Sequence, residues 1–230
     1  MPTTRYLLKD GTRVPGTTTI IGKYKESGGL IHWAWQQGVD GLDYRKTRDA
    51  AADAGTLGHR MFELYLDQVK DWQIADRGLP FDLAVEELQV EDREVIQNAK
   101  TALESAVRWW EIMKAEVVDQ EMHLVSEEWR FGGTPDAILR IDGKLALADW
   151  KTSKRIYHDT VLQVAAYRHL WEHVHPDQPL ESFHVCRFDK EMGNFTHHNW
   201  PKKLIDLGWK KFKLLRRAYD VDAKLKKVSL

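Results

Sequence analysis

The first half of the chain has apolar residues mainly at helical spacing. The segment RYLLKDGTRV predicts a short hairpin that turns at Asp10-Gly11, and Thr17 or Thr18 is expected to cap the short helix after it. Apolar residues then recur three and four positions apart in three further stretches, which predicts three helices. The glycines of AGTLGH predict a break in the second, and DRGLPFD is expected to be a loop. The expected helices cover about 29–38, 43–69 and 85–114.

From about residue 117 the pattern changes to the alternation that is typical of strands. Helical spacing returns after the third of these strands and again at the end of the chain, where Pro201 lies in the first helical turn. The resulting order is helices, three strands, a helix, strands and a helix. This order predicts an α/β (α+β) fold, with a mixed sheet and helices packed on it. The expected strands cover about 117–125, 128–141, 144–150, 182–188 and 194–200, and the expected helices about 158–174 and 201–220.

Composition fits one domain and gives no overall charge signal. The 230 residues include 34 basic and 35 acidic side chains, so net charge argues neither for nor against nucleic acid as a partner. The charges are unevenly placed, because 80–128 has thirteen acids and four bases whereas 201–230 has ten bases and three acids. The C-terminal helix is therefore the candidate surface for contact with phosphates, through Lys210, Lys211, Lys213, Arg216 and Arg217. The alternative is an ordinary solvated helix face.

Several classes of protein are disfavoured. A single cysteine, Cys186, cannot form an intramolecular disulfide framework or ligate an iron–sulfur cluster, so a reducing compartment and no cluster are expected. Neither an apolar leader nor an apolar run near 18 residues is visible, which favours a cytoplasmic protein without membrane contact. No glycine-rich nucleotide-binding loop occurs, so the chain is not expected to be an ATP-driven motor.

The strongest chemical signal is a pair of aspartates in an otherwise apolar hairpin. Asp142-Gly143 predicts a type I′ turn, which sets Ile141 opposite Lys144 and, stepping outward, Asp136 opposite Asp149. Two like charges in that position destabilise a sheet unless something neutralises them, and a divalent cation bound through oxygen is the simplest answer. Lys151 lies two residues beyond Asp149 and therefore projects from the same face. The alternative is a surface hairpin with solvated acids and a salt bridge to Lys151.

Two flanking helices carry further polar residues at helical spacing. His59 follows the glycines of AGTLGH, and Glu63 lies one turn later on the same face. Gln163 and Tyr167 are likewise one turn apart on the helix after the Asp149 strand. Taken alone, each pair is more often structural than functional.

In combination, these residues resemble the PD-(D/E)XK nuclease superfamily and, within it, the RecB-type exonuclease branch. The four motifs occur in order over about 55–167: a glycine-then-histidine helix (Gly55 to His59), G-x-x-D (Gly133 to Asp136), D-x-K (Asp149 to Lys151) and Q-x-x-x-Y (Gln163 to Tyr167). The resemblance implies an αβββαβ core at 55–200, preceded by a lead-in at 1–54 and followed by the basic helix and tail at 201–230. The lead-in is also similar to that of stand-alone phage-encoded and mitochondrial members.

The resemblance also implies roles for the matched positions. Asp136 and Asp149, with the main-chain carbonyl of Trp150, would bind Mg²⁺ or Mn²⁺, and Lys151 would be the catalytic lysine. His59 would complete the metal site or a second one, and Gln163 with Tyr167 would hold DNA or brace the lysine. Glu63 is a further candidate for the metal shell, and Glu121 another, with Glu128 as its competitor.

Three functions remain open. The leading one is a metal-dependent DNA exonuclease in recombination, repair or phage DNA processing. A structure- or sequence-specific endonuclease on the same core is the second, because a fold does not fix function. The third is a nucleic-acid-binding module without activity, which the opposed aspartates disfavour. The chain has no helicase segment, so it would act on available DNA ends or with a separate helicase or strand-annealing protein.

Overall fold

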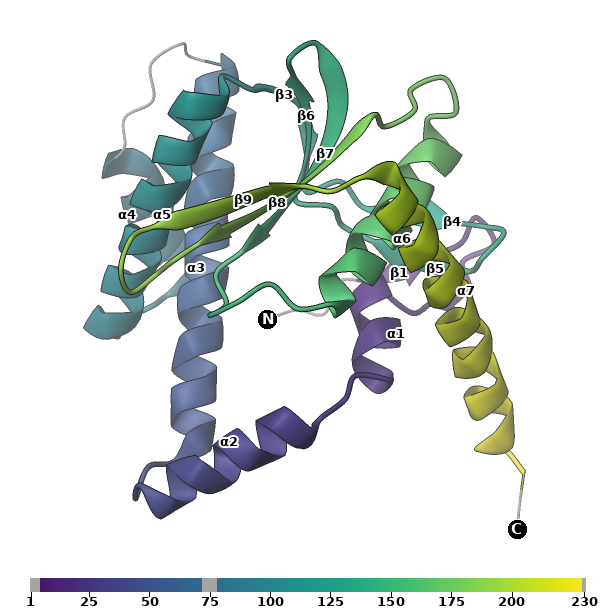
Figure 1. Cartoon of the computed structure of the whole chain (residues 1–230), viewed down its shortest axis with the longest axis horizontal. Coiled ribbons are helices and arrows are strands. Elements are labelled where there is room, and N and C mark those ends of the chain that lie inside the picture. Colours follow the sequence, from purple (N-terminus) through teal and green to yellow (C-terminus); the bar gives the residue numbers. More distant parts are fainter. Residues whose placement is uncertain (1–4, 72–77, 229–230) are drawn as a thin grey trace.

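The computed structural model describes residues 5–71 and 78–228 of the chain. Its centre is a mixed sheet of five strands in the order β3-β6-β7-β8-β9, in which only the β7–β8 pair is parallel (Figure 1). Two small antiparallel pairs, β1–β2 and β4–β5, lie beside it. The strands are β1 (Tyr6–Leu7), β2 (Arg13–Val14), β3 (Glu116–Gln120), β4 (Leu124–Ser126), β5 (Phe131–Gly133), β6 (Ala137–Ile141), β7 (Lys144–Lys151), β8 (Ser182–Phe188) and β9 (Phe195–Asn199).

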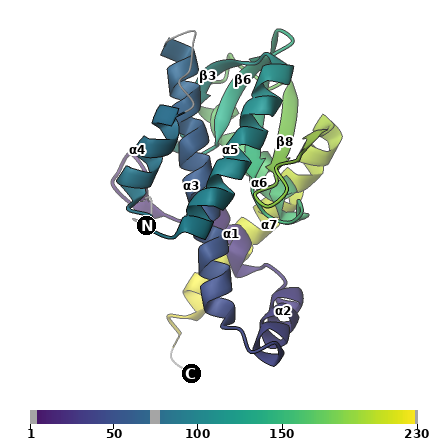
Figure 2. The same cartoon turned by 90° about the vertical axis from the view of Figure 1, so that its left-hand side faces the viewer.

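Helices cover both faces of the sheet. Helices α3 and α5 pack against one face, and α6 packs against the other with α7 and α1 outside it (Figure 1). Figure 2 shows α3, α4 and α5 running along the same side of the molecule. The expected α/β class is confirmed by this arrangement. The helices are α1 (Thr17–Lys23), α2 (Gly28–Val39), α3 (Tyr44–Asp71), α4 (Gly78–Leu88), α5 (Arg93–Met113), α6 (Asp159–Val174) and α7 (Lys202–Leu225).

Each face of the sheet has its own apolar core. The first core, under α3 and α5, contains an aromatic cluster of Phe62, Trp109, Trp150 and Phe188. The second core, under α6, contains Leu147, Val185 and Leu170 with the ring pair Phe131–Phe212. Successive residues of β7 alternate between the two cores, as side chains along a strand must. The sheet is therefore buried on both sides over most of its area.

The hairpin of β6 and β7 has the expected register. Ile141 pairs with Lys144, and the ladder continues outward to Ala137 opposite Ala148. Asp142 and Gly143 have φ values of 49° and 77°, as a type I′ turn requires. The next pair outward is Asp136 and Asp149, so the local turn rule placed both acids correctly.

Two helix predictions were wrong. Helix α3 is continuous through AGTLGH, because its glycines serve close packing rather than a break: a Cβ on Gly55 would lie 2.8 Å from Thr152 Oγ1. The expected helix over 85–114 is two helices, because Asp92 caps α5 by accepting from the amides of Glu94 and Val95. Part of DRGLPFD belongs to α4 rather than to a loop, and its first two residues lie outside the described part of the chain.

Strand boundaries also differed. The stretches 117–125 and 128–141 are each interrupted, because β4 and β5 pair with each other in a separate sheet. Thr17 is the first residue of α1 rather than its cap, and its Oγ1 donates to the carbonyl of Gly132 instead. The final helix is longer than expected and ends at Leu225.

Helix α2 lies away from the sheet, at the bottom of Figure 1 and of Figure 2. None of its residues is buried, and Trp35 remains 61% exposed. Within 5–71 and 78–228, no helix is both long and apolar enough to cross a membrane.

Candidate active site

The end of β7 places an acid and a base on one face of the sheet. Asp149 and Lys151 occupy the odd positions that Leu145 and Leu147 occupy earlier in the strand, facing α6. The Lys151 Nζ lies 2.5 Å from Asp149 Oδ2, and the Asp149 side chain is fully buried. No partner among the described residues hydrogen-bonds to Asp149 Oδ1. A buried carboxylate thus keeps one oxygen without a donor.

Asp136 lies opposite Asp149, is held by the main chain of β7 and lies near His59. Its Oδ2 accepts a hydrogen bond of 2.6 Å from the main-chain N–H of Trp150, and its Oδ1 is 3.8 Å from His59 Nδ1. The ring of Trp150 points into the first core, while its amide fixes the carboxylate. The carbonyl of Trp150 as a metal ligand stays a prediction.

Glu121 is a third carboxylate, which forms a row with Asp136 and Asp149 across the adjacent strands β3, β6 and β7. Glu121 follows β3, and its N–H donates to the carbonyl of Asp136 over 3.2 Å. Its φ of 49° lies in the left-handed region, so the strand ends sharply at this residue. Glu128, the competing candidate, is exposed in the turn between β4 and β5, away from this row. The sheet register therefore places Glu121 beside Asp136, and its role as a metal ligand stays a prediction.

Helix α3 brings His59 and Glu63 to the strand ends. Glu63 Oε1 is 2.7 Å from Arg60 Nη1, so this acid already has a basic partner. Burial, and then the charge of Lys151, lower the pKa of His59 to about 4 against opposing effects of Asp149 and Glu63. The ring is therefore neutral at pH 7, the form in which histidine binds metals. Gly55, one turn earlier, lets α3 approach Thr152 just after the end of β7.

The carboxylates repel one another in a poorly solvated place. Burial, and secondarily Asp136 and Glu63, raise the pKa of Glu121 to about 9. Burial raises the pKa of Asp149 to about 6, although Lys151 acts to lower it. Burial also raises the pKa of Asp136. Burial acts to lower the pKa of Lys151, but Asp149 and Asp136 outweigh it and the pKa is raised. Burial is therefore the largest cause of the raised pKa in all three carboxyl groups.

Helix α6 supplies a hydrogen-bonded pair next to the aspartates. Gln163 Nε2 donates to Tyr167 Oη over 3.0 Å, as the one-turn spacing predicted. Burial, and then the charges of Asp136 and Asp149, raise the pKa of Tyr167 well above its ordinary value. The glycine of the G-x-x-D motif makes room for this ring, since a Cβ on Gly133 would lie 2.6 Å from Tyr167 Cε1.

Sequence reasoning missed a polar group contributed by the N-terminal hairpin. Tyr6 Oη and His123 Nδ1 each lie 2.9 Å from Thr134 Oγ1. Burial raises the pKa of Tyr6, with a further contribution from the charge of Glu121, so the cluster borders the carboxylate row. Tyr6 reaches this place by packing over Gly132, a contact between residues far apart in the chain that no local pattern signals.

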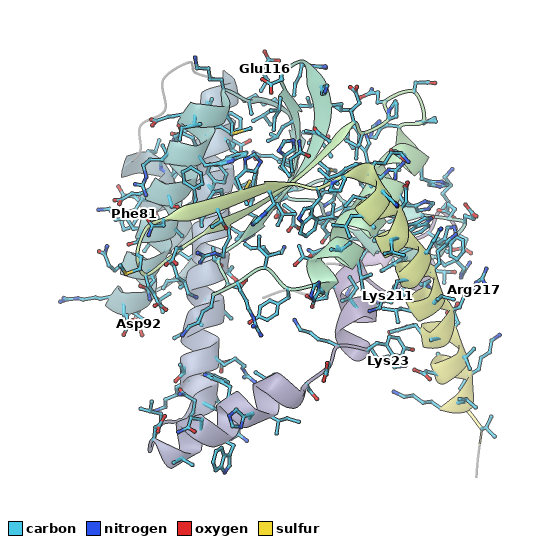
Figure 3. The ribbon with its side chains drawn as sticks, in the orientation of Figure 1. Lys23, Phe81, Asp92, Glu116, Lys211 and Arg217 are labelled. Atoms are coloured by element: carbon cyan, nitrogen blue, oxygen red, sulfur yellow. The ribbon has the colours of Figure 1, made fainter. Side chains whose placement is uncertain are left out.

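The structure does not bring the basic helix together with the aspartates. Helix α7 packs on the outer side of α6 through Ile205, Gly208 and Phe212, and a Cβ on Gly208 would lie 2.7 Å from the carbonyl of Val161. Lys210, Lys211 and Arg217 are exposed on its other surface, and Figure 3 labels the last two.

Three of the five basic residues predicted on α7 contact other parts of the protein, and the exposed one of them, Arg217, lies 5.7 Å from the ring of Trp129. Lys213 is half-buried, with its Nζ 5.6 Å from the ring of Trp129. Arg216 is buried, and its guanidinium donates to the carbonyls of Trp129 and Arg130 and pairs with Asp220. Arg216 therefore holds the β4–β5 turn, and we do not propose it as a DNA contact.

The model of the PD-(D/E)XK nuclease superfamily matches residues 31–217. No curated protein matches.

The solved structures that match include a protein of Eubacterium rectale provisionally named an exonuclease. It is 10% identical with a TM-score of 0.48, and the match covers 73% of this chain and 69% of that one. A complex of LHK-Exo with dAMP is 11% identical with a TM-score of 0.38, over 77% of this chain and 94% of that one. The four motifs at 55–167 all lie within the residues that the family model matches. Because that match spans well over half of the chain, the protein belongs to the PD-(D/E)XK nuclease superfamily.

Proposed function

We propose that the protein is a metal-dependent DNA exonuclease of the RecB-type branch, which hydrolyses phosphodiester bonds from DNA ends. The observation that carries the proposal is the buried Asp149 opposite Asp136, with Lys151 on the same face. A module that only binds nucleic acid gains nothing from burying opposed carboxylates, which cost stability.

The residues present fit a hard divalent cation such as Mg²⁺ or Mn²⁺. Asp149 has an oxygen without a hydrogen-bond donor, and the pKa values of Asp149, Asp136 and Glu121 are all raised. Carboxylate oxygens are the ligands that such ions prefer. In the described part of the chain, no three His, Cys, Asp or Glu side chains form a metal site as they stand, since Asp149 is turned to Lys151 and Asp136 to the Trp150 amide.

Asp136, Asp149 and the Trp150 carbonyl would hold the ion, with His59 and Glu121 as further ligands and Glu63 as a neighbour. A bound divalent ion would supply charge neutralisation at the phosphate and a lowered pKa of water.

The protein groups have separate tasks in this proposal. The Lys151 ammonium orients the attacking water and stabilises negative charge that develops on the phosphate. The Gln163–Tyr167 pair lines the substrate side of the aspartates and holds the DNA strand. The exposed Lys210, Lys211 and Arg217, with Lys213, would contact phosphates only at a distance from the cleaved bond.

The test is digestion of linear and covalently closed circular DNA, each single- and double-stranded, with Mg²⁺ or EDTA. Wild type is expected to degrade linear DNA only, and only with the metal, whereas Asp149→Asn is expected to degrade none. Cutting of circles would reassign the protein as an endonuclease. Binding without cutting by the wild type, with Mg²⁺ or Mn²⁺, would contradict the proposed enzyme.

A second test addresses His59. Because its neutral ring lies 3.8 Å from Asp136, His59→Ala is expected to shift the Mg²⁺ concentration for half-maximal cleavage upward. His32→Ala is the matched control, since His32 lies on α2 and is exposed. An unchanged Mg²⁺ titration for His59→Ala would remove this histidine from the metal site.

A further inference from the structure

A cavity of about 530 Å³ lies next to the catalytic strand and is lined by residues that none of the motifs includes. The loop between β7 and α6, strands β8 and β9, and the start of α7 form its walls. Its volume is in the range of small-ligand sites, which is about 300–1,000 Å³. The lining groups with chemical character are Lys154, Arg155, Tyr157, Arg187, His198 and Trp200.

Sheet register places this cavity on the same face as the catalytic pair. In the parallel ladder Lys151 pairs with Arg187, and Arg187 in turn pairs with Thr196 on β9. His198 pairs with Val185, the partner of Asp149. Neighbouring strands are about 5 Å apart, so the cavity begins about 5 Å to the side of Lys151. One ligand molecule can therefore place one of its groups in the cavity and another at the aspartates.

Cations without acidic partners dominate one wall. Lys154 and Arg155 are exposed, and among the described residues neither is in a salt bridge. Arg187 is paired with Asp189 over 3.0 Å, so it contributes less free charge. The residues that line the cavity include no aspartate or glutamate. This wall is suited to a phosphate.

Aromatic side chains adjoin these cations in the lining. Tyr157 is 40% exposed and is flanked by cations, with Arg155 5.0 Å and Lys25 4.9 Å from its ring centre. The main chain at Trp200 is fixed by a hydrogen bond of 2.8 Å from its backbone N–H to the carbonyl of Phe183. Flat rings beside cations are the pattern that binds a nucleobase next to its phosphate.

We propose that this cavity binds one nucleotide of the DNA strand being cut, next to the scissile phosphate. Lys154 and Arg155 hold its phosphate, and Tyr157 and Trp200 hold its base. The proposal rests on the proposed nuclease function and specifies how that site reads single-stranded DNA. A strand rather than a free nucleotide is favoured because the cavity is open to solvent and shares a face with Lys151.

Binding measured without cleavage separates this proposal from the activity itself. Each variant is made in the Asp149→Asn protein, and fluorescence anisotropy reports the Kd for a labelled twelve-residue thymidine strand at several salt concentrations. Lys154→Ala/Arg155→Ala is expected to raise the Kd about tenfold. It should also reduce the slope of log Kd against log salt by about 0.7 for each phosphate that the variant no longer neutralises.

The control removes the same charge from the far end of the sheet. Lys114→Ala/Lys144→Ala changes two exposed lysines near the β6–β7 turn, where Glu116 is labelled in Figure 3, and should leave the Kd within twofold. For the base, Tyr157→Ala should weaken binding of the thymidine strand several-fold but not of an abasic strand, and Tyr157→Phe should bind as the parent does.

A free nucleotide offers the same phosphate and base as one nucleotide of a DNA strand. Titration calorimetry with thymidine 5′-monophosphate distinguishes these two ligands. Weak or undetectable binding of the free nucleotide is expected, since it lacks the neighbouring phosphate. Tight binding of the mononucleotide, with strand binding unaffected in Lys154→Ala/Arg155→Ala, would overturn the proposal. An unchanged Kd of Lys154→Ala/Arg155→Ala for the thymidine strand would overturn it as well, whatever the affinity for the mononucleotide. If the Asp149→Asn parent binds no DNA at all, the nuclease proposal fails together with this one.

Discussion

The two faces of strand β7 follow different rules. On the closed face, formed by Ala146, Ala148 and Trp150, apolar residues continue to the end of the strand and pack under α3 and α5. On the open face, Leu145 and Leu147 are succeeded by Asp149 and Lys151, although Asp149 is as deeply buried as its apolar neighbours. One strand thus alternates, residue by residue, between a surface that is apolar to its end and a surface that ends in charged side chains. Both faces contribute an apolar core, and the burial of Asp149 on the open face costs stability.

The largest expected effect comes from the open face. Lys151→Met keeps the length of the side chain but removes the charge that stabilises the phosphate, so cleavage is expected to fall about 10²–10³-fold or more. Circular dichroism should show unchanged helix and strand content. Lys144→Met, at the other end of β7, should cleave normally. A folded Lys151→Met protein with full activity would contradict the assignment of the open face.

On the closed face, the main effect of a substitution is expected to be on stability rather than on cleavage. Trp150→Ala removes a ring that contacts Phe62, Trp109 and Phe188, so the free energy of unfolding is expected to fall by about 3–5 kcal/mol. Urea denaturation measures this. Trp35→Ala, at a ring that is 61% exposed, should change it by less than about 0.5 kcal/mol.

Gly133 tests how closely α6 and α1 pack on the side of the open face. A Cβ there would lie within 3 Å of Tyr167, Thr17 and Leu170, so Gly133→Ala is expected to cost about 1–3 kcal/mol and to lower cleavage by displacing Tyr167. Gly22→Ala is the control, since Gly22 is helical with open space around it and should gain about 0.5–1 kcal/mol. Equal melting temperatures for the two variants would be inconsistent with the close approach.

The smallest effect concerns a histidine pair on the closed side. His184 Nδ1 lies 2.8 Å from His197 Nε2, and burial, then His197, lower the pKa of His184 to about 4 against an opposing effect of Asp142. The unfolded chain takes up this proton near pH 6.5, before the folded protein does. The contribution of His184 is therefore complete above pH 6.5 and is lost as the pH falls toward 4.

Comparison with His184→Gln isolates that contribution. The difference in unfolding free energy between wild type and variant should shrink between pH 6.5 and 4, by at most about 1.4 kcal/mol per pH unit. Urea unfolding at half-unit pH steps measures it. A difference that does not change with pH would mean that the pair titrates normally.

Local rules predicted the parts of the site that are close in sequence. A two-residue turn fixed the register of Asp136 and Asp149, and strand parity placed Lys151. Helical spacing gave the Gln163–Tyr167 hydrogen bond. The mixed sheet itself followed from the order of helical and alternating segments.

Long-range packing decided what those rules missed. The glycines of α3 were expected to end a helix, but they allow α3 to approach β7 and α5. Tyr6 joins the border of the site from more than a hundred residues away, and Arg216 is buried although it belongs to a basic stretch. In each case the neighbour that gives the residue its role lies in another element, so no local pattern contains it.

The approach of Gly55 to Thr152 has a consequence for the evolution of such chains. A Cβ at position 55 would lie 2.8 Å from the Thr152 hydroxyl, so neither residue can change freely while the other is kept. An alanine at 55 requires a smaller residue at 152, a different rotamer of Thr152 or a shift of α3 that would carry His59 away from Asp136. We therefore expect the two positions to covary among related nucleases, with glycine at the first wherever a branched side chain follows the lysine that corresponds to Lys151.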